Sequence, residues 1–569
     1  MPEASLAGRL RHWSANARIQ SALALVAYVV VSILLFGRGV IGSLDKKVVG
    51  DGGSDKTIAM WALEWWPHAL ARGDDPYSAD VVWAPSGMNL AWVTAIPGAS
   101  LLASPLTWAF GPVTTYNILV LVAPAAAAGT AFLLALWVTE VFWPAFMAGL
   151  IFGFSSYEIG HAIGHLNLIL VFVVPVCVLL VLRRFAGELS RNRFVAYLTV
   201  ALTAQFLFST EIILTLVGVG VSSLVLAWWL LEKDARPLLR RTTWESMVAL
   251  LLTGALVSPH LVHAFLVTGV SWAPTRSPFD AAADVANFVV PRRWTWLRPP
   301  GSDEITAQFA TNPVESTAYL GLPLVAIIVL FAVRRGRPRS HRLLLALLAL
   351  TAITSLGAWV RLAGTTIAVG PWQLFSRLPV TKNALPVRFT LYVALFAALV
   401  CALWLAEKRN SPIRWLVALF AVIALLPTPS TSFWSSDVPR PTFFADGFAA
   451  RTFDPDDVVL VLPYGKAGWS MLWQAESGFT YRMAGGRLGN LPPDEQRWLP
   501  VLRALAGGPQ TREAVRMLQP FLSEHEVDAI VVAPGARVGP RRLVETLGIR
   551  PTPESDALVY ELRSEALAP

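Results

Sequence analysis

The chain has 569 residues, of which 55% are hydrophobic and only 15% are charged, and its mean hydropathy is +0.54. Soluble proteins carry roughly 25% charged residues, so this composition excludes a mainly soluble enzyme and a disordered chain. The formal net charge of +8 does not indicate nucleic-acid binding, because the basic residues lie in short loops beside apolar runs. The two cysteines, Cys177 and Cys401, lie in apolar segments, which excludes a disulfide framework and a cysteine-rich metal site.

The first predicted membrane span runs from Gln20 to about Gly42, long enough to cross about 30 Å of hydrocarbon. Arg9, Arg11 and Arg18 precede it, and no small-residue cleavage site follows it. This pattern is typical of a retained anchor with a cytoplasmic N-terminus. Further apolar runs bring the number of predicted spans to eleven; they lie near residues 113–137, 141–157, 167–182, 194–209, 212–231, 244–267, 317–333, 342–358, 388–406 and 413–427.

The basic residues support this count, because cytoplasmic loops collect Lys and Arg. With eleven spans starting inside, the inner loops 183–193, 232–243, 334–342 and 407–414 hold four, four, five and three basic side chains. The tiny turn 138–140 is the exception. A full crossing by residues 93–110 would reverse every later loop, so we expect a juxtamembrane or re-entrant helix there. The outer segments are then 43–112, 268–316, 359–387 and 428–569.

The composition changes at Pro427, after which charge is ordinary. Residues 457–463, 527–533 and 557–562 have the pattern of short strands, and residues 511–525 have helical periodicity. The sequence therefore predicts a membrane module over 1–427 and a small extracytoplasmic α/β domain over 428–569. The glycine-rich segment 481–490 does not connect a strand to a helix, which favours a loop over a nucleotide site.

The first outer loop carries the most informative pattern. Asp51 and Asp55 flank glycines in GDGGSD, directly after the first span. A helix with Trp61, Trp65 and Trp66 follows, and tryptophan is enriched where helices lie at the membrane interface. We therefore expect an interfacial helix beside an acidic pair, Asp51 and Asp55.

This arrangement resembles the membrane-embedded GT-C glycosyltransferases, which use a sugar carried on a polyprenyl phosphate. The resemblance lies in the early span, the acids of the first outer loop, the interfacial helices, the many spans and the outer C-terminal domain. The segments ALEWWPHAL, WAPSGMNLAW and GHAIGHLNL are similar to segments of bacterial members. It implies a polytopic α-helical GT-C-like fold in the bacterial plasma membrane. It also implies sugar transfer from a polyprenyl-phosphate donor to a glycan, lipid or protein acceptor on the outer side, by inversion.

In this family the functional acid opens the first outer loop, which here matches Asp51, with Asp55 as the other candidate. Such an acid serves as the general base that takes a proton from the acceptor hydroxyl. The spacing GDGGSD departs from the Asp-x-Asp of several members. It leaves open which acid acts and whether a divalent cation, Mg²⁺ or Mn²⁺, is held; no other cofactor is expected.

The leaving phosphate needs cationic partners on the outer face. The available candidates are Arg292, Arg293, Lys382 and Arg388. Arginine suits bidentate phosphate capture better than lysine, and Arg388 begins a span just after a proline, so we rank it first. The alternative for each is a contact with lipid headgroups at a span end.

Four polar residues near outer span ends are further candidates for a substrate cavity. Glu211 lies between the fifth and sixth spans, and Glu315 precedes the eighth; an ionisable group so close to lipid is costly unless it is paired or solvated. His161 and His165 have i, i+4 spacing, but the glycines at 160 and 164 weaken a helix there. Hydrogen bonding to sugar or phosphate is favoured over a zinc site.

Two other classes of function remain open at this stage. A transporter or lipid-carrier flippase is the main alternative, although such proteins place charged groups at mid-membrane and often show internal repeats. Here the acids gather at outer span ends, and no duplication is visible. A structural or regulatory membrane protein with a glycan-binding outer domain is the third.

Overall fold

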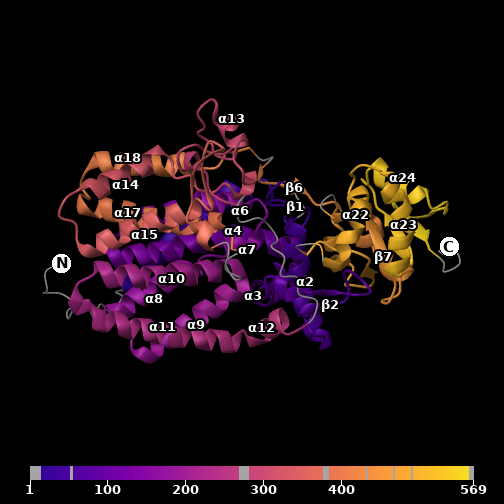
Figure 1. Cartoon of the computed structure of the whole chain (residues 1–569), viewed down its shortest axis with the longest axis horizontal. Coiled ribbons are helices and arrows are strands. Elements are labelled where there is room, and N and C mark those ends of the chain that lie inside the picture. The colour runs from indigo at the N-terminus through magenta and orange to yellow at the C-terminus, as the bar shows by residue number, and fades with distance from the viewer. Residues whose placement is uncertain are drawn as a thin grey trace. The chain divides into compact units, whose positions relative to one another are not determined.

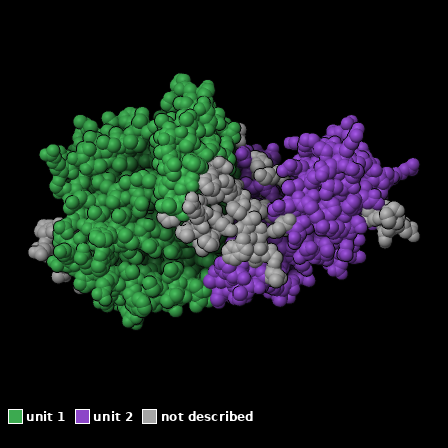
Figure 2. All heavy atoms as spheres, viewed as in Figure 1, with its two compact units in different colours: residues 1–39, 119–257, 274–434 green, residues 40–118, 258–273, 435–569 purple. Residues whose placement is uncertain are grey.

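A computed structural model describes residues 15–51, 55–267, 281–375, 384–430, 433–465, 468–488, 491 and 493–562. The chain divides into two compact units, coloured separately in Figure 2. Unit 1 comprises residues 1–39, 119–257 and 274–434, and unit 2 comprises residues 40–118, 258–273 and 435–569. Each unit is therefore built from separated stretches of chain, and the module boundary at residue 427 stays a prediction.

Unit 1 is mainly helical, and its helices α8, α9, α10 and α11 lie side by side (Figure 1). A two-stranded hairpin, β4 (Trp359–Leu362) and β5 (Thr365–Val369), interrupts the helices. The helices are α1 (Ala15–Ser32), η1 (Ile33–Gly37), the later part of α4 (Ser104–Thr139), α5 (Phe142–Gly153), α6 (Ser156–Ala162), α7 (Leu166–Ile169), α8 (Val173–Phe185), α9 (Arg191–Phe208), α10 (Thr210–Leu230), η3 (Lys233–Ala235), α11 (Arg236–Leu256), η4 (Val285–Phe288), α13 (Ser302–Ala307), η5 (Pro313–Glu315), α14 (Leu322–Val333), α15 (Arg339–Ser355), α16 (Trp372–Phe375), η7 (Pro386–Phe389), α17 (Thr390–Glu407) and α18 (Pro412–Leu425).

Helix α17 forms the centre of unit 1. It is apolar around almost its whole circumference, as expected of a helix enclosed by others, and it packs against α5, α14 and α15. Helix α5 in turn approaches α4 closely at Gly153. A Cβ added to this glycine would lie 2.5 Å from both the Ala128 Cβ and the Pro124 carbonyl oxygen, so no larger residue fits there. Small residues at such crossings let membrane helices pack backbone to backbone.

Every predicted span falls on a helix or a pair of consecutive helices. Five helical segments are long and apolar enough to cross a membrane within the described residues, or six if α11 and α12 (Ser258–Phe265), bent by 67°, count as one. Helices α5, α14 and α18 are apolar but shorter. The chain is thus a multi-pass membrane protein, while the count of eleven stays a prediction. The stretch 93–110, expected as a juxtamembrane or re-entrant helix, follows η2 (Leu90–Trp92) and contains α3 (Pro97–Leu102) and the start of α4, up to the break at Gly111.

Unit 2 contains a five-stranded sheet in the order β10-β11-β9-β7-β8. Strand β7 (Val458–Leu462) pairs in parallel with β8 (Arg482–Met483) and β9 (Ala529–Val532), whereas β11 (Ala557–Glu561) pairs antiparallel with β9 and with β10 (Thr552–Glu554). Strands β7 and β9 are buried throughout, which explains their continuous β-branched sequences. The helices of this part are α19 (Thr442–Ala445), α20 (Ala449–Thr452), α21 (Ser470–Glu476), η10 (Pro493–Trp498), α22 (Leu499–Leu505), α23 (Arg512–Glu524) and α24 (Val538–Glu545).

Helix α23 follows the predicted periodicity. The Thr511 hydroxyl accepts a hydrogen bond from the Ala514 amide at 3.1 Å and so caps its first turn. Ala514, Leu518 and Phe521 are buried, at the spacing that places side chains on one helix face. The three predicted strands coincide with β7, β9 and β11.

A buried ion pair beside α23 makes this part of unit 2 sensitive to pH. His525 donates from Nδ1 to the Phe521 carbonyl at 2.9 Å and from Nε2 to the Glu495 carboxylate at 2.9 Å, so both ring nitrogens carry protons. Burial alone would lower the pKa of His525, but the hydrogen bond to Glu495 raises it above its ordinary value of 6.5.

A histidine with a raised pKa stabilises the folded state fully below pH 6.5, and this contribution is lost as pH rises through the folded-state value. We therefore expect the amides of α23 to lose hydrogen-exchange protection between pH 6 and pH 8, after correction for intrinsic exchange rates. Glu495→Gln should remove that pH dependence. Equal protection at both pH values in the unmodified protein would contradict the assignment.

The expectation that Trp61, Trp65 and Trp66 face the membrane interface is wrong. These side chains of α2 (Asp55–Arg72) are buried inside the protein. Their indole N–H groups donate to the Gln474 side chain, the Pro76 carbonyl and the Ala95 carbonyl, at 2.8 to 2.9 Å. Helix α21 packs against α2, so chain from another part of the sequence covers the face that resembled an interfacial one.

Candidate functional site

The acidic pair lies in unit 2, where local structure fixes the backbone that leads to Asp51. Strand β1 (Lys47–Val48) pairs with β6 (Ser436–Asp437). The Asn117 side chain donates to the Leu44 and Lys47 carbonyls at 2.8 and 2.7 Å and accepts from the Val49 amide at 2.8 Å. Gly50 follows with a φ of 101°, a conformation that favours glycine. The hydrogen bonds of Asn117 and the conformation of Gly50 therefore fix the backbone that positions Asp51.

Asp55 begins α2, where an acid in the first turn interacts favourably with the helix dipole. Its carboxylate forms an ion pair with Arg487, and the two side chains are 38% and 14% exposed. Helix α2 is fixed further along by Trp61, whose partner Gln474 also donates to the Val81 and Tyr481 carbonyls. Both acids of the pair are thus attached to well-packed backbone.

Lys56, the next residue of α2, is 1% exposed. Its ammonium nitrogen has no hydrogen-bond partner among the described residues, although the charges of Asp51 and Asp55 both act on it. Burial lowers the pKa of Lys56 to about 8, and the two carboxylates act in the opposite direction. The Lys56 ammonium is therefore a buried cation beside the acidic pair, and its N–H donors have no acceptor among the described residues.

A second polar cluster lies in unit 1 around Arg388, which is 3% exposed. Its Nε donates to Glu211 at 2.7 Å, Nη2 donates to Glu315 at 3.0 Å, and Nη1 also donates to Glu315. The residues come from η7, the start of α10 and η5. One positive charge thus meets two negative ones, and the Glu211 side chain, at 37%, is the most exposed of the three.

His161 completes this cluster from α6. Its Nδ1 lies 2.8 Å from the Tyr157 carbonyl oxygen, to which it can only donate, so Nε2 of a neutral ring is the acceptor for Arg388 Nη1 at 3.2 Å. Burial lowers the pKa of His161, in agreement with a neutral ring. Burial would raise the pKa of Glu315, but the Arg388 charge and the hydrogen bonds from Arg388 hold it well below its ordinary value.

Neither a family model nor a curated protein sequence matches the chain. Solved structures do. An arabinofuranosyltransferase, AftD, from Mycobacteria superposes with a TM-score of 0.61 at 15% identity over 96% of this chain. The oligosaccharyltransferase of Archaeoglobus fulgidus, in complex with Zn and sulfate, superposes with a TM-score of 0.55 at 13% identity over 90% of this chain. The chain has the GT-C fold.

This result confirms the GT-C fold that the family resemblance implied. The archaeal oligosaccharyltransferase AglB from Archaeoglobus fulgidus, in complex with an inhibitory peptide and a dolichol-phosphate, superposes at a TM-score of 0.50 and 10% identity over 91% of this chain. The chain spans 68 to 70% of the oligosaccharyltransferase and 41% of AftD. At 10 to 15% identity these likenesses establish the fold and leave the substrate to be proposed.

The described residues around the acidic pair do not by themselves form a divalent-cation site. Ca²⁺ takes six to eight oxygen ligands, and Mg²⁺ is usually held by one or two carboxylates, with waters and substrate phosphates completing its shell. Here two carboxylates are accompanied by the Lys56 ammonium and the Arg487 guanidinium. Nowhere in the described part of the chain do three or more His, Cys, Asp or Glu side chains gather as a metal site.

The structure brings four of the predicted residues together, namely His161, Glu211, Glu315 and Arg388. Arg292 lies elsewhere: it is buried and donates to the Thr306 carbonyl at 2.7 Å and the Ser316 hydroxyl at 2.5 Å, so it braces the loop before η5. Arg293 lies over the Phe433 ring, His165 lies edge-on to His161, and Lys382 lies outside the described residues. The roles of all these residues stay predictions.

Sequence reasoning missed several groups next to the two clusters. Beside His161, the Tyr157 hydroxyl and both Glu158 carboxyl oxygens are buried without hydrogen-bond partners in the described structure. Burial raises the pKa of Glu158 well above its ordinary value. In unit 2, Lys56 and Arg487 were missed as well. The segment GHAIGHLNL identified the two histidines as candidates. Glu158 lies just before this segment, and no sequence pattern indicated that it is buried.

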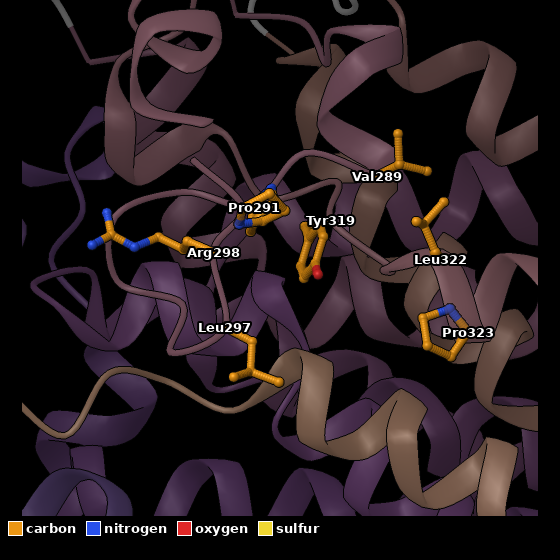
Figure 3. A pocket seen from close by; sticks show the side chains of 8 residues that line it. Val289, Pro291, Leu297, Arg298, Tyr319, Leu322 and Pro323 are labelled. Carbon is orange, nitrogen blue, oxygen red and sulfur yellow. The ribbon is translucent and has the colours of Figure 1, made fainter. Parts of the chain in front are cut away.

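An apolar cavity of about 350 Å³ lies between η4 and α14 in unit 1 (Figure 3). Its lining includes Val289, Leu297, Tyr319 and Leu322. Arg298 extends away from these side chains in Figure 3, and its guanidinium pairs with Asp303 at 2.9 Å. The lining is therefore mainly apolar, and its one arginine is already paired.

Proposed function

We propose that the chain is a membrane glycosyltransferase that moves a sugar from a polyprenyl-phosphate donor to a glycan, lipid or protein acceptor on the outer side of the plasma membrane. The observation that carries this proposal is the GT-C fold over at least 90% of the chain, and the acidic pair in the loop after the first apolar helix supports it. The dolichol-phosphate bound by AglB supports the choice of donor class. The proposed soluble part over 428–569 contains the five-stranded sheet.

Asp51 is the proposed general base. Its carboxylate accepts the proton of the acceptor hydroxyl while that oxygen forms a bond to the anomeric carbon. The bond from the anomeric carbon to the phosphate oxygen breaks, and its electron pair leaves with the lipid phosphate. A single displacement of this kind inverts the anomeric centre, whereas retention would need two carboxyl groups about 5 Å apart acting in turn.

Arg388 is the proposed partner of the donor phosphate. Its Nε faces Glu211, the more exposed of its two carboxylate partners, whereas Glu315 is buried. A phosphate oxygen that takes the place of the Glu211 carboxylate would gain a charge-assisted hydrogen bond, while Glu315 and His161 keep the guanidinium in position. Glu211 then acts as a displaceable anion.

A reconstituted assay tests the proposal. The full chain in lipid nanodiscs receives polyprenyl-phosphate sugars with a labelled sugar, together with a cell-envelope fraction as acceptor. We expect labelled covalent product, released polyprenyl phosphate in equal amount, and an inverted anomeric centre by NMR. Nucleotide sugars, the control donors, should give no product. Solute or lipid flux in proteoliposomes, with no covalent product from any donor, would contradict the proposal and favour a transporter.

A further inference from the structure

The feature that the proposed roles leave unexplained is the environment of Lys56. A lysine is almost never fully buried unless its charge is paired, yet Lys56 is 1% exposed and its Nζ has no hydrogen-bond partner in the described part of the chain. Lys56 belongs to α2 and directly follows Asp55 in the sequence. The three N–H donors of the ammonium group are therefore available to a ligand.

Tyr116, in α4, is a second buried polar side chain near Asp51 and Asp55. Its hydroxyl is buried without a hydrogen-bond partner among the described residues, and it lies within electrostatic reach of both Asp51 and Asp55. Buried polar groups normally have partners, and an unsatisfied one costs free energy. Two such groups beside one acidic pair indicate a cradle whose hydrogen bonds are completed by a bound molecule.

The charges of this cradle are already balanced. Asp51 and Asp55 carry two negative charges, and Lys56 and Arg487 carry two positive ones. A divalent cation would add two further positive charges beside the Lys56 ammonium and would find Asp55 already paired with Arg487. The electrostatics therefore oppose a metal ion, and the unsatisfied donors of Lys56 and Tyr116 favour a ligand that accepts hydrogen bonds.

We propose that the Lys56 ammonium is the resident cation of the acidic pair and binds the donor phosphate in the place that a divalent metal would otherwise hold. Sugar transfer by this chain then needs no added metal; this part rests on the proposed function. Lysine serves as a point charge for phosphate.

Manganese binding tests the inference without any substrate. The full chain in nanodiscs is titrated with Mn²⁺ and followed by electron paramagnetic resonance. We expect no stoichiometric site in the unmodified protein and a gain of Mn²⁺ binding in Lys56→Gln, because removal of the ammonium leaves the carboxylates less compensated. A stoichiometric Mn²⁺ site in the unmodified protein that disappears in Asp51→Asn would overturn the inference.

Phosphate binding gives the second readout. Undecaprenyl phosphate should bind equally well with and without EDTA, and Lys56→Met should weaken its binding at least about 10-fold. Lys47→Met is the matched control: Lys47 is half-exposed and only 4.0 Å from Asp437, so its loss should leave binding unchanged. Circular dichroism and gel filtration confirm that each variant is folded.

A folded Lys56→Met variant with unchanged phosphate affinity, or binding abolished by EDTA and restored by Mg²⁺, would overturn the inference. These outcomes are separate from the failure of the proposed function. A chain that binds no Mn²⁺ and loses phosphate affinity in Lys56→Met supports the inference even if no donor yields product. Metal-dependent transfer would keep the proposed function and remove Lys56 from it.

Discussion

Asp51→Asn will lower the rate of sugar transfer by about 10²- to 10⁴-fold, the range over which a positioned general base contributes. The amide keeps the size of the carboxylate but cannot take the acceptor proton. The turn at Gly50 and the Asn117 clamp act through the backbone, so the variant should fold and express normally. The measurement is the initial rate of labelled product in nanodiscs, at saturating donor.

Two further variants make this result specific. Asp45→Asn is the matched control, because Asp45 is an exposed acid of the same loop and should be dispensable. Asp55→Asn should have a smaller effect than Asp51→Asn, because Asp55 is engaged by Arg487 and its loss acts through position. A fully active Asp51→Asn variant beside an inactive Asp55→Asn variant would transfer the role of base to Asp55.

The parts of the fold that the sequence predicts well are those set by local composition. Every predicted span falls on helix because long apolar runs in lipid must satisfy their own backbone hydrogen bonds. Helix α23 and strands β7 and β9 were predictable for a similar reason. The apolar periodicity of α23 indicates one buried face, and the continuous apolar runs of β7 and β9 indicate strands that are buried on both faces. The count of spans is less secure, because α5 and α14 have only 12 residues each.

The failures come from contacts between residues distant in sequence. Trp61 looks interfacial in its own segment, and only its hydrogen bond to Gln474, 413 residues later, shows that it is buried. Arg487 meets Asp55 across 432 residues. Such partners leave no mark on the local pattern, so a single sequence could nominate Asp55 but could not indicate that it is already paired.

The Arg388 cluster was predictable only in part: the sequence indicated its residues but not their pairing. Glu211, Glu315 and Arg388 were each predictable as ionisable residues at span ends, because lipid makes such groups costly without a role. Their mutual pairing was not, since Arg388 is 177 residues from Glu211 and 73 from Glu315. That pairing changes the chemistry: a phosphate must compete with a carboxylate for the guanidinium.

Arg388→Met is expected to destabilise the protein by about 3 to 5 kcal/mol, the cost of leaving one partner of a buried ion pair without the other. Glu315 is 2% exposed, and in this variant its buried charge would lose the guanidinium that pairs with it. Thermal unfolding in one detergent, followed by tryptophan fluorescence, measures the effect. Arg339→Met is the matched control, because Arg339 is 47% exposed and lies 3.8 Å from Glu232, a pair of little energetic value.

A second substitution separates packing from charge. In the Arg388→Met background, Glu315→Gln removes the stranded charge and should recover a large part of the lost stability, because a neutral amide is far cheaper to bury. Equal stability of the single and double variants would contradict a charge-based explanation. Undecaprenyl phosphate should raise the unfolding midpoint of the unmodified protein by mass action, and much less that of the double variant. A shift that survives in the double variant would remove Arg388 from the phosphate site while leaving its contribution to stability intact.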